Sequence, residues 1–183
     1  NMPALLHGIR VLDFGRYIAG PYCAALLAEY GADVIRIEKR DGSEDRFPTP
    51  VGGGAGALFL QMNRNKRSMT LDPASPEGRK VVERMVKRAD VVIANLPQAT
   101  LNSMGLDYAT LCSYKPDVIF VTNTAFGAVG PMHRNVGFDS VAQAMCGSVY
   151  MTGEPEQPYR ATAPWVDFGT ALHCAFGTMA ALM

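Results

Sequence analysis

Residues 9–38 read IRVLDFGRYIAGPYCAALLAEYGADVIRIE, and this stretch decides the fold. Residues 9–14 are mostly β-branched or apolar, which predicts a strand. Pro21 suits the first turn of a helix and Gly31 suits the left-handed position that ends one, so we expect a helix from Pro21 to Tyr30. A second β-branched run predicts a strand over 33–38. A strand, a helix and a strand with short connections favour a parallel pair joined by a right-handed crossover.

The rest of the chain continues the alternation of apolar strands and helices, which indicates an α/β protein. We expect one domain over residues 1–183, built as a Rossmann-like parallel sheet flanked by helices. Residues 39–58 are rich in Gly and Pro and are expected to form a long mobile loop. The other strands are expected over 69–71, 90–95 and 118–121, and the other helices over 76–89, up to Met104, and over 107–114, 138–150 and 167–183.

The composition is that of an ordinary globular protein without a strong electrostatic field. The chain has 183 residues, 48% of them hydrophobic, with 17 basic and 17 acidic side chains. A balanced charge argues against recruitment of nucleic acid or of an anionic membrane surface. The longest apolar run is too short and too rich in Ala, Gly and Thr to span a bilayer. We therefore expect no nucleic acid partner, no membrane partner and a cytoplasmic location.

Two common cofactor sites are not indicated by the sequence. The four cysteines lie far apart and lack the CxxC or Cys/His spacing of metal ligands, so we expect reduced thiols and no metal site. Residues 15–20 follow the first strand, where a dinucleotide fingerprint would lie, but they lack the spacing G-x-G-x-x-G. A nicotinamide cofactor is therefore not expected.

Basic side chains near the ends of the predicted strands are candidates for phosphate binding. Arg16 and Tyr17 offer a cation and a ring after the first strand, and the alternative is a solvent-facing Arg and a packed Tyr. Two local clusters could also hold phosphates, although each residue taken alone is more often simply exposed. They are Lys39 with Arg40, and Arg64 with Lys66 and Arg67.

Asp167 is a lone carboxylate in otherwise apolar sequence, at the start of a predicted buried helix. One interpretation is an N-cap, in which the carboxylate accepts a hydrogen bond from a free N–H of the first turn. The other is a catalytic nucleophile, which the positive end of the helix would help to keep ionised. The residues by themselves leave both interpretations open.

The chain resembles the family III CoA-transferases of the CaiB/BaiF type, which include formyl-CoA transferase and are related to alpha-methylacyl-CoA racemase. The resemblance covers the whole chain and rests on the order and spacing of several short motifs. These are Val11-Leu12-Asp13-Phe14, Ala19-Gly20-Pro21, the segment 31–38, Asn65-Lys66-Arg67-Ser68, Asp90-Val91-Val92 with Asn95, Met104-Gly105, Val141-Ala142-Gln143 and Asp167. Members are roughly twice this long, so the resemblance implies the N-terminal part of a CoA-binding large domain. A second, smaller domain would lie outside the chain, which we expect to be inactive alone.

The resemblance implies a reaction and a set of site residues. Asp167 would attack an acyl-CoA thioester, pass through a mixed anhydride and an aspartyl-CoA thioester, and hand CoA to a free carboxylic acid. Coenzyme A would be a substrate rather than a permanently bound cofactor, and the complete protein would be an interlocked homodimer. The implied CoA contacts are Arg16, Ile18, Ala19, Lys39, Leu71, Asp72, Pro73, Ala74, Asn95, Leu96, Pro97, Asn135, Val136, Gly137 and Phe138. Some relatives carry a basic residue where Ser103 and Val136 stand, so Arg134 or Arg16 would have to supply that charge.

Two other functions remain possible at this point. Acyl-CoA racemases of similar fold shuttle a proton between a His and the Asp, but the His position corresponds to Phe138, which cannot accept a proton. His133 would have to replace it. The other alternative is a non-catalytic module that binds CoA or another nucleotide.

Overall fold

A computed structural model describes residues 4–183 and shows a five-stranded sheet in which all neighbouring strands are parallel. The strands are β1 (Arg10–Asp13), β2 (Asp33–Glu38), β5 (Arg67–Thr70), β6 (Val91–Ala94) and β7 (Ile119–Thr122). Their order is β5-β2-β1-β6-β7. The predicted α/β class and the parallel pairing of the first two strands are therefore confirmed.

The order of the strands creates a switch point between β1 and β6. From β1 the chain first adds β2 and β5 on one side, and then returns to add β6 and β7 on the other. The connections that leave β1 and β6 therefore diverge at the carboxyl edge of the sheet. Ligands of open α/β sheets commonly bind in such a crevice.

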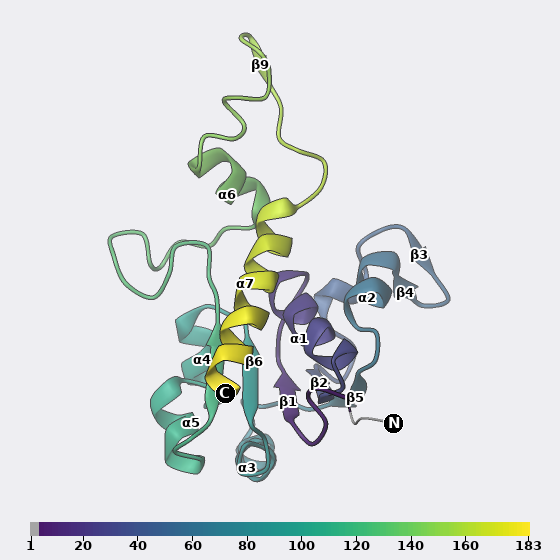
Figure 1. Ribbon diagram of the computed structural model, residues 1–183, viewed down its shortest axis with the longest axis vertical. Coiled ribbons are helices and arrows are strands. Elements are labelled where there is room, and N and C mark those ends of the chain that lie inside the picture. The colour runs from purple at the N-terminus through teal and green to yellow at the C-terminus, as the bar shows by residue number, and fades with distance from the viewer. Residues whose placement is uncertain (1–3) are drawn as a thin grey trace.

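Helices cover both faces of the sheet (Figure 1). On one face α1 (Ala19–Glu29) packs beside α7 (Trp165–Leu182), and on the other lie α3 (Pro76–Val86), α4 (Gln98–Met104) and α5 (Tyr108–Tyr114). Successive side chains of β1 point to opposite faces, so that Val11 enters the first core and Leu12 the second. Within residues 4–183, no helix is both long and apolar enough to cross a bilayer.

The expectation of one long loop over 39–58 is wrong. The segment contains a 3-10 turn, Glu44–Arg46, and a small hairpin of β3 (Val51–Gly52) and β4 (Ala55–Gly56), and leads into α2 (Ala57–Met62). Asp45 is buried and accepts two hydrogen bonds from Arg36, at 2.9 and 2.8 Å. A buried ion pair of this kind fixes a segment whose Gly and Pro content alone favours mobility.

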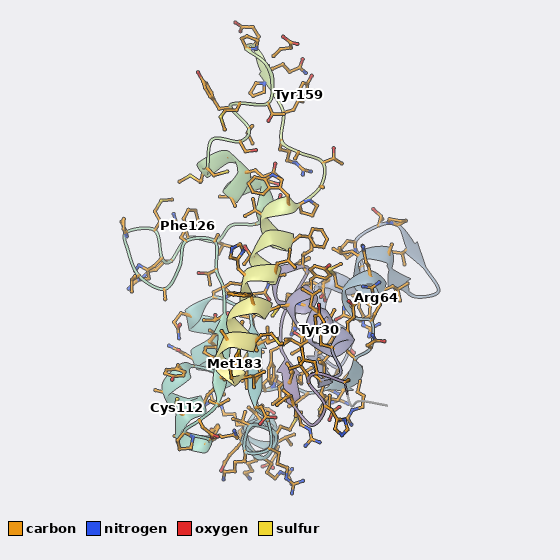
Figure 2. All side chains as sticks on the ribbon, viewed as in Figure 1. Tyr30, Arg64, Cys112, Phe126, Tyr159 and Met183 are labelled. Carbon is orange, nitrogen blue, oxygen red and sulfur yellow. The ribbon has the colours of Figure 1, made fainter. Side chains whose placement is uncertain are left out.

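The C-terminal elements also differ from those expected. The helix expected over 138–150 is shorter, α6 (Asp139–Met145), and turns follow it. Residues 152–158, whose Gly, Pro and Glu content is typical of a loop, form a small hairpin of β8 (Gly153–Glu154) and β9 (Gln157–Pro158). This hairpin, with Tyr159 beside it, stands away from the sheet at the top of the view (Figure 2).

The last helix is not the buried helix that its apolar sequence predicts. Only Ala171, Ala175 and Thr178 are buried, and they face α1 and the sheet. On the opposite side, Leu172 is 54% exposed and Phe176 77% exposed. Apolar content predicts burial, but one sheet face can cover only one side of a helix.

A network of buried charges lies under the carboxyl edge of β1 and β2. Arg36 is 1% exposed and pairs with Asp45 at 2.8 Å, with Asp13 at 3.8 Å and with Glu38 at 3.8 Å. Lys66 adds a second cation, with its Nζ 2.7 Å from Asp13 Oδ2. Lys66 and Arg36 together hold the pKa of Asp13 below its usual range in spite of burial, which acts in the opposite direction. The network therefore fixes the loops that follow β1 and β2 at the carboxyl edge of the sheet.

Replacing Gly20 in the first turn of α1 by alanine is expected to destabilise the protein by about 1–3 kcal/mol, because the site has no room for a side chain. A Cβ there would lie 2.9 Å from Asn95 Oδ1 and 3.1 Å from the Gly15 Cα. At Gly177 in α7 a Cβ would meet nothing within 4 Å, so Gly177→Ala should instead stabilise by up to about 1 kcal/mol. Urea denaturation of both variants tests this, and a stabilised Gly20→Ala variant would contradict the packing.

Candidate active site

The predicted ligand edge is formed by the loops that leave adjacent strands. Ile18, Lys39 and Asn95 follow β1, β2 and β6, and the carboxyl ends of these parallel strands meet at the same edge of the sheet. The segment 71–74 follows β5 at the same edge, where the Leu71 N–H donates to the Glu38 carbonyl at 2.8 Å. The structure thus brings these predicted residues to one side of the domain.

Arg16 and Asn95 join the two loops at the switch point. The Arg16 N–H donates to Asn95 Oδ1 at 2.6 Å, and Asn95 Nδ2 donates to the Arg16 carbonyl at 2.8 Å. This reciprocal pair holds the chain before Ile18 and Ala19, which are both buried. Leu96 is half-buried and Pro97 is exposed, and they lead into α4.

The side chain of Arg16 does not face solvent, contrary to both interpretations of the sequence. It is 6% exposed, and its Nη1 donates to the carbonyls of Phe14 and Gly15 at 2.8 and 2.7 Å. Its Nε lies 3.9 Å from Glu44 Oε1. In this arrangement the guanidinium braces the loop from within and is not presented to a phosphate.

The basic clusters of the sequence also turn out to be engaged in ion pairs. Lys66 donates to Asp13 and to the Pro21 carbonyl, both at 2.7 Å, and is nearly inaccessible, so its suggested phosphate-binding role is wrong. Arg64 and Arg67 pair at the surface with Glu29 and Asp33. Lys39 pairs with Glu44 at 3.0 Å but is 66% exposed and remains accessible to an anion.

The segment 135–138, which lies between β7 and α6, enters the same region. Asn135 and Val136 are exposed, and Phe138 is 59% exposed where α6 begins. The Phe138 ring meets the Tyr17 ring edge-on, with 5.4 Å between the ring centroids. Tyr17 has a φ of 60°, a left-handed conformation that is uncommon outside glycine, and its N–H donates to Asp45 Oδ2 at 3.1 Å. The loop after β1 therefore contacts the start of α6 directly.

Asp167 is not the N-cap of α7. The helix begins at Trp165, two residues before the acid, and Pro164 holds the cap position. The N–H groups of Val166 and Asp167 donate instead to Asp139 Oδ1, at 2.9 and 3.2 Å. Across residues 4–183, no donor is within hydrogen-bonding reach of the Asp167 carboxylate, which is half-buried. The neighbouring Phe168 packs edge-on against Tyr22 of α1, at 5.1 Å.

Burial, together with the smaller effect of the negative charge of Asp139, raises the pKa of Asp167 to about 6. The two effects outweigh the helix N-terminus, which by itself favours the ionised form. At neutral pH the carboxylate is still mostly ionised, yet it is more basic than an ordinary aspartate. A half-buried, ionised carboxylate with free lone pairs has the properties of a nucleophile.

We expect Asp167→Asn to raise the free energy of unfolding of this chain by about 1 kcal/mol at pH 7, and by almost nothing at pH 4. The folded state binds the Asp167 proton more tightly than the unfolded state, so ionised Asp167 opposes folding above pH 6 and stops doing so as the pH falls below 3.8. The magnitude is kept small because solvent screens a partly exposed carboxylate. Urea denaturation at both pH values tests this, and a variant that is destabilised at pH 7 would contradict it.

The sequence did not predict the contact of Asp139 with Asp167 or that of Tyr17 with Phe138. Asp139 immediately follows Phe138 and precedes Gln143 by one helical turn, a spacing that would have indicated a polar pair. Its contact with a residue so much later in the chain has no signal in the sequence. The same holds for the left-handed Tyr17.

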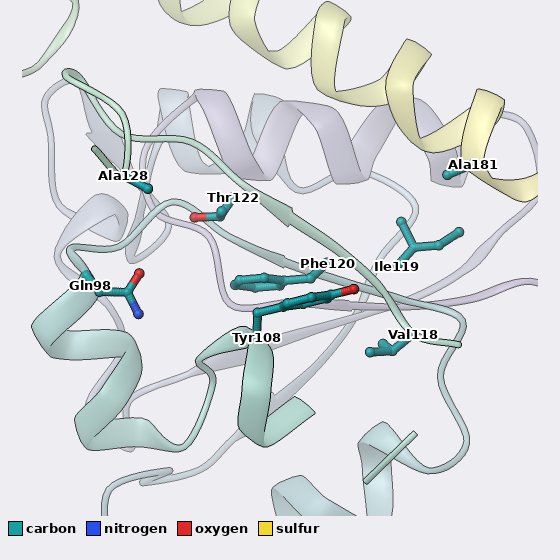
Figure 3. Close-up of a pocket in the computed structure, with 8 residues that line it drawn as sticks. All are labelled: Gln98, Tyr108, Val118, Ile119, Phe120, Thr122, Ala128 and Ala181. Carbon is teal, nitrogen blue, oxygen red and sulfur yellow. The ribbon is translucent and has the colours of Figure 1, made fainter. Parts of the chain in front are cut away.

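A cavity lies away from these residues, along the edge strand β7 (Figure 3). It measures about 580 Å³, and the residues that line it carry neutral side chains. They are Gln98, Tyr108, Val118, Ile119, Phe120, Thr122, Ala128 and Ala181. Because none of them belongs to the predicted CoA contacts and none is an acid or a base of suitable pKa, we place the candidate active site at Asp167 instead.

Comparisons with known proteins identify the relatives of this chain. A family model described as CoA-transferase family III matches residues 6–183. The succinate–glutarate CoA-transferase of Agrobacterium fabrum is 37% identical over 100% of this chain and 48% of its own length. The succinyl-CoA–L-malate CoA-transferase beta subunit of Chloroflexus aurantiacus is 37% identical over 97% of this chain and 45% of its own length.

Solved structures show the same arrangement of elements. A CaiB/BaiF family protein from Brucella suis has a TM-score of 0.93 and 36% identity, covering 99% of this chain and 50% of that one. A hypothetical protein from Mycobacterium tuberculosis has a TM-score of 0.92 and 33% identity, covering 100% of this chain and 51% of that one. The chain thus spans about half the length of these relatives.

Proposed function

The chain belongs to CoA-transferase family III, and on this premise we propose that it is the CoA-binding half of an enzyme that moves CoA from an acyl-CoA to a free carboxylic acid. The similar proteins named above are CoA-transferases whose names specify succinate, glutarate or malate. The acids used by this protein are left open, because the other half of the complete protein would contribute to the acyl site.

The observation that carries the proposal is the state of Asp167. The carboxylate is half-buried, accepts no hydrogen bond within the described part of the chain, and has a pKa raised to about 6. A purely structural acid at a helix start would cap it, and here Asp139 does so instead. Asp167 is therefore free to attack an electrophile.

We propose that the reaction consists of two matched acyl-transfer sequences at Asp167, one with the donor acid and one with the acceptor acid. Its carboxylate attacks the thioester carbonyl and expels CoA thiolate, which leaves a mixed anhydride. The thiolate then attacks the Asp167 carbonyl, which forms aspartyl-CoA and releases the donor acid. The acceptor carboxylate reverses this sequence, takes the CoA and regenerates Asp167, so that no electrons or protons are gained overall.

We propose that CoA lies along the carboxyl edge of β5, β2, β1 and β6. The accessible members of the predicted set support this, above all Lys39 with its exposed ammonium group. The inward-facing Arg16 is assigned to bracing the loop, and exposed Arg134 is the better candidate for a phosphate contact. Asn135 and Phe138 would border the end nearest Asp167.

The proposed enzyme also needs more protein than this chain. Exposed apolar side chains gather on α6, on α7 and on the turns between them, as expected of a surface that other protein covers. They are Val141, Met145, Tyr150, Met151, Leu172 and Phe176. We propose that the complete protein is a homodimer, and sedimentation as a monomer at micromolar concentration would refute this. A cytoplasmic location is also proposed, since the four cysteines within residues 4–183 are free thiols.

Trapping the covalent intermediate tests the proposed function. The complete protein would be incubated with succinyl-CoA and then treated with hydroxylamine, which converts an aspartyl thioester or anhydride into a hydroxamate. We expect the mass change on the peptide that contains Asp167, and none when free CoA replaces the acyl-CoA. Reversible binding of acyl-CoA without a hydroxamate would favour the non-catalytic module.

The racemase alternative gains no support from the geometry. The phenyl ring of Phe138 cannot accept a proton. His133 lies on an exposed loop, with its Nδ1 2.6 Å from the Gly130 carbonyl. Retention of the α-hydrogen of a 2-methylacyl-CoA in deuterated water would exclude it experimentally.

A further inference from the structure

Asp139 is a second carboxylate beside Asp167, and both of its oxygens are engaged. It opens α6 and is 6% exposed. Its Oδ1 accepts from the N–H groups of Val166 and Asp167, and its Oδ2 accepts from Gln143 Nε2 at 2.5 Å. A single side chain from one helix thus supplies the cap of another.

Gln143 completes this connection. It is fully buried, and its Oε1 accepts from the Ala161 N–H at 2.8 Å, while its Nε2 also lies 3.3 Å from the Ala163 carbonyl. The pair therefore ties α6 to the segment that enters α7 at several points. Residues 150–160, which lead into this segment, are exposed, so the pair anchors the chain where it enters α7.

We propose that Asp139 is a positioning residue for Asp167: it fixes the first turn of α7 from outside that helix and keeps a negative charge beside the nucleophile. The inference rests on the proposed function of Asp167. By occupying the first-turn N–H groups, Asp139 removes the donors that would otherwise bind the Asp167 carboxylate. The nucleophile is thereby left with unshared lone pairs and with a neighbour that disfavours its ionised form.

The other charged or titratable groups near this turn have contacts of their own. On α7, exposed His173 has its Nδ1 2.8 Å from the Gly169 carbonyl, one turn below. In the preceding segment, exposed Arg160 donates to the Ala161 carbonyl at 3.3 Å. From α1, Tyr22 packs through its ring on Phe168. Asp139 is the charged group from a packed element that acts on Asp167.

The test is an NMR titration of isotope-labelled aspartate carboxyls in this chain. Asp139→Asn keeps an oxygen for the two N–H groups but removes the charge, so the Asp167 midpoint should fall by about half a pH unit or more. Asp139→Ala removes the acceptor as well, and the Val166 and Asp167 amides should then exchange at least about tenfold faster. An Asp167 midpoint that does not move in Asp139→Asn overturns the proposal.

A second variant covers the case in which Asp139→Asn disturbs the fold. Asp139→Ser also removes the charge, and its hydroxyl can accept from a first-turn N–H or from Gln143 Nε2 without setting a second amide donor against that nitrogen. The Asp167 midpoint should again fall, and an unchanged midpoint counts against the proposal. Asp117→Asn, at an exposed surface pair with Lys115, is the matched control and should leave the midpoint where it is.

The complete protein then separates this inference from the function on which it rests. The acidic limb of kcat/KM for CoA transfer should move to lower pH in Asp139→Asn, which a merely structural residue would not cause. A moved Asp167 midpoint without any hydroxamate at Asp167 would refute the transferase and leave the positioning role. A hydroxamate at Asp167 together with an unmoved Asp167 midpoint would support the transferase and refute the positioning role of Asp139.

Discussion

The proposed CoA transfer by the complete protein is expected to fall by several orders of magnitude in Asp167→Asn, because the change removes the proposed nucleophile and with it the covalent route. An amide of nearly the same shape leaves the fold intact, and the cap of α7 depends on Asp139 and not on Asp167. CoA affinity should therefore change little, since the proposed CoA contacts lie along the strand ends. Steady-state kinetics and CoA titration by calorimetry measure the two effects separately.

The control for this variant is Asp117→Asn, which also removes one carboxylate but at a surface position 81% exposed. It should retain the activity of the unchanged protein. Near-normal turnover in Asp167→Asn would contradict a nucleophilic role. Equal losses of activity and of CoA binding would instead indicate that Asp167 shapes the binding site.

Replacing Arg36 by methionine is expected to lower the free energy of unfolding by about 3–5 kcal/mol, the largest stability effect that we predict. The change leaves Asp13, Glu38 and Asp45 buried near one another without their shared cation. A buried carboxylate that loses its partner must either remain charged in a poor solvent or take up a proton, and both options destabilise the folded state. Urea denaturation at pH 7 measures the loss.

Arg67→Met on the neighbouring strand β5 is the matched control. Arg67 also pairs with an aspartate, Asp33, at 2.7 Å, but the two side chains are 63% and 36% exposed. Its loss should cost no more than about 1 kcal/mol because solvent already screens the pair. If the free energy of unfolding falls by a similar amount in both variants, burial does not make the ion pairs of Arg36 more important for stability than the exposed pair of Arg67.

Much of the fold could be predicted because it follows from local patterns. The β-branched runs at 9–14 and 33–38, with Pro21 and Gly31 between them, report directly on strand, helix start and helix end. Errors arose where an interaction between distant residues decided the outcome. The segment 39–58 has the composition of a loop, but the pairing of Arg36 with Asp45 fixes it in place.

The candidate site divides in the same way. The sequence singled out Asp167 as a lone acid before a helix, and its resemblance to a family suggested the nucleophile, which stays a prediction. Nothing in the sequence indicated that the Arg16 side chain would turn inward or that Lys66 would form a buried ion pair with Asp13. Whether a basic side chain meets solvent depends on which acids the fold brings within a few ångströms, and spacing along the chain does not report this.

By itself, then, the sequence determined the five strands of the parallel sheet and most of its helices, although not α2 or the two small hairpins. It also indicated the edge of the sheet at which the loops lie and singled out Asp167. Those features depend on propensity, periodicity and the alternation of elements, which are properties of neighbouring residues. Only the tertiary structure decided that Asp139 caps α7 and that no donor among the described residues 4–183 reaches the Asp167 carboxylate. The ionisation of a carboxylate is set by its burial and by nearby charges, which come from elements far apart in the chain.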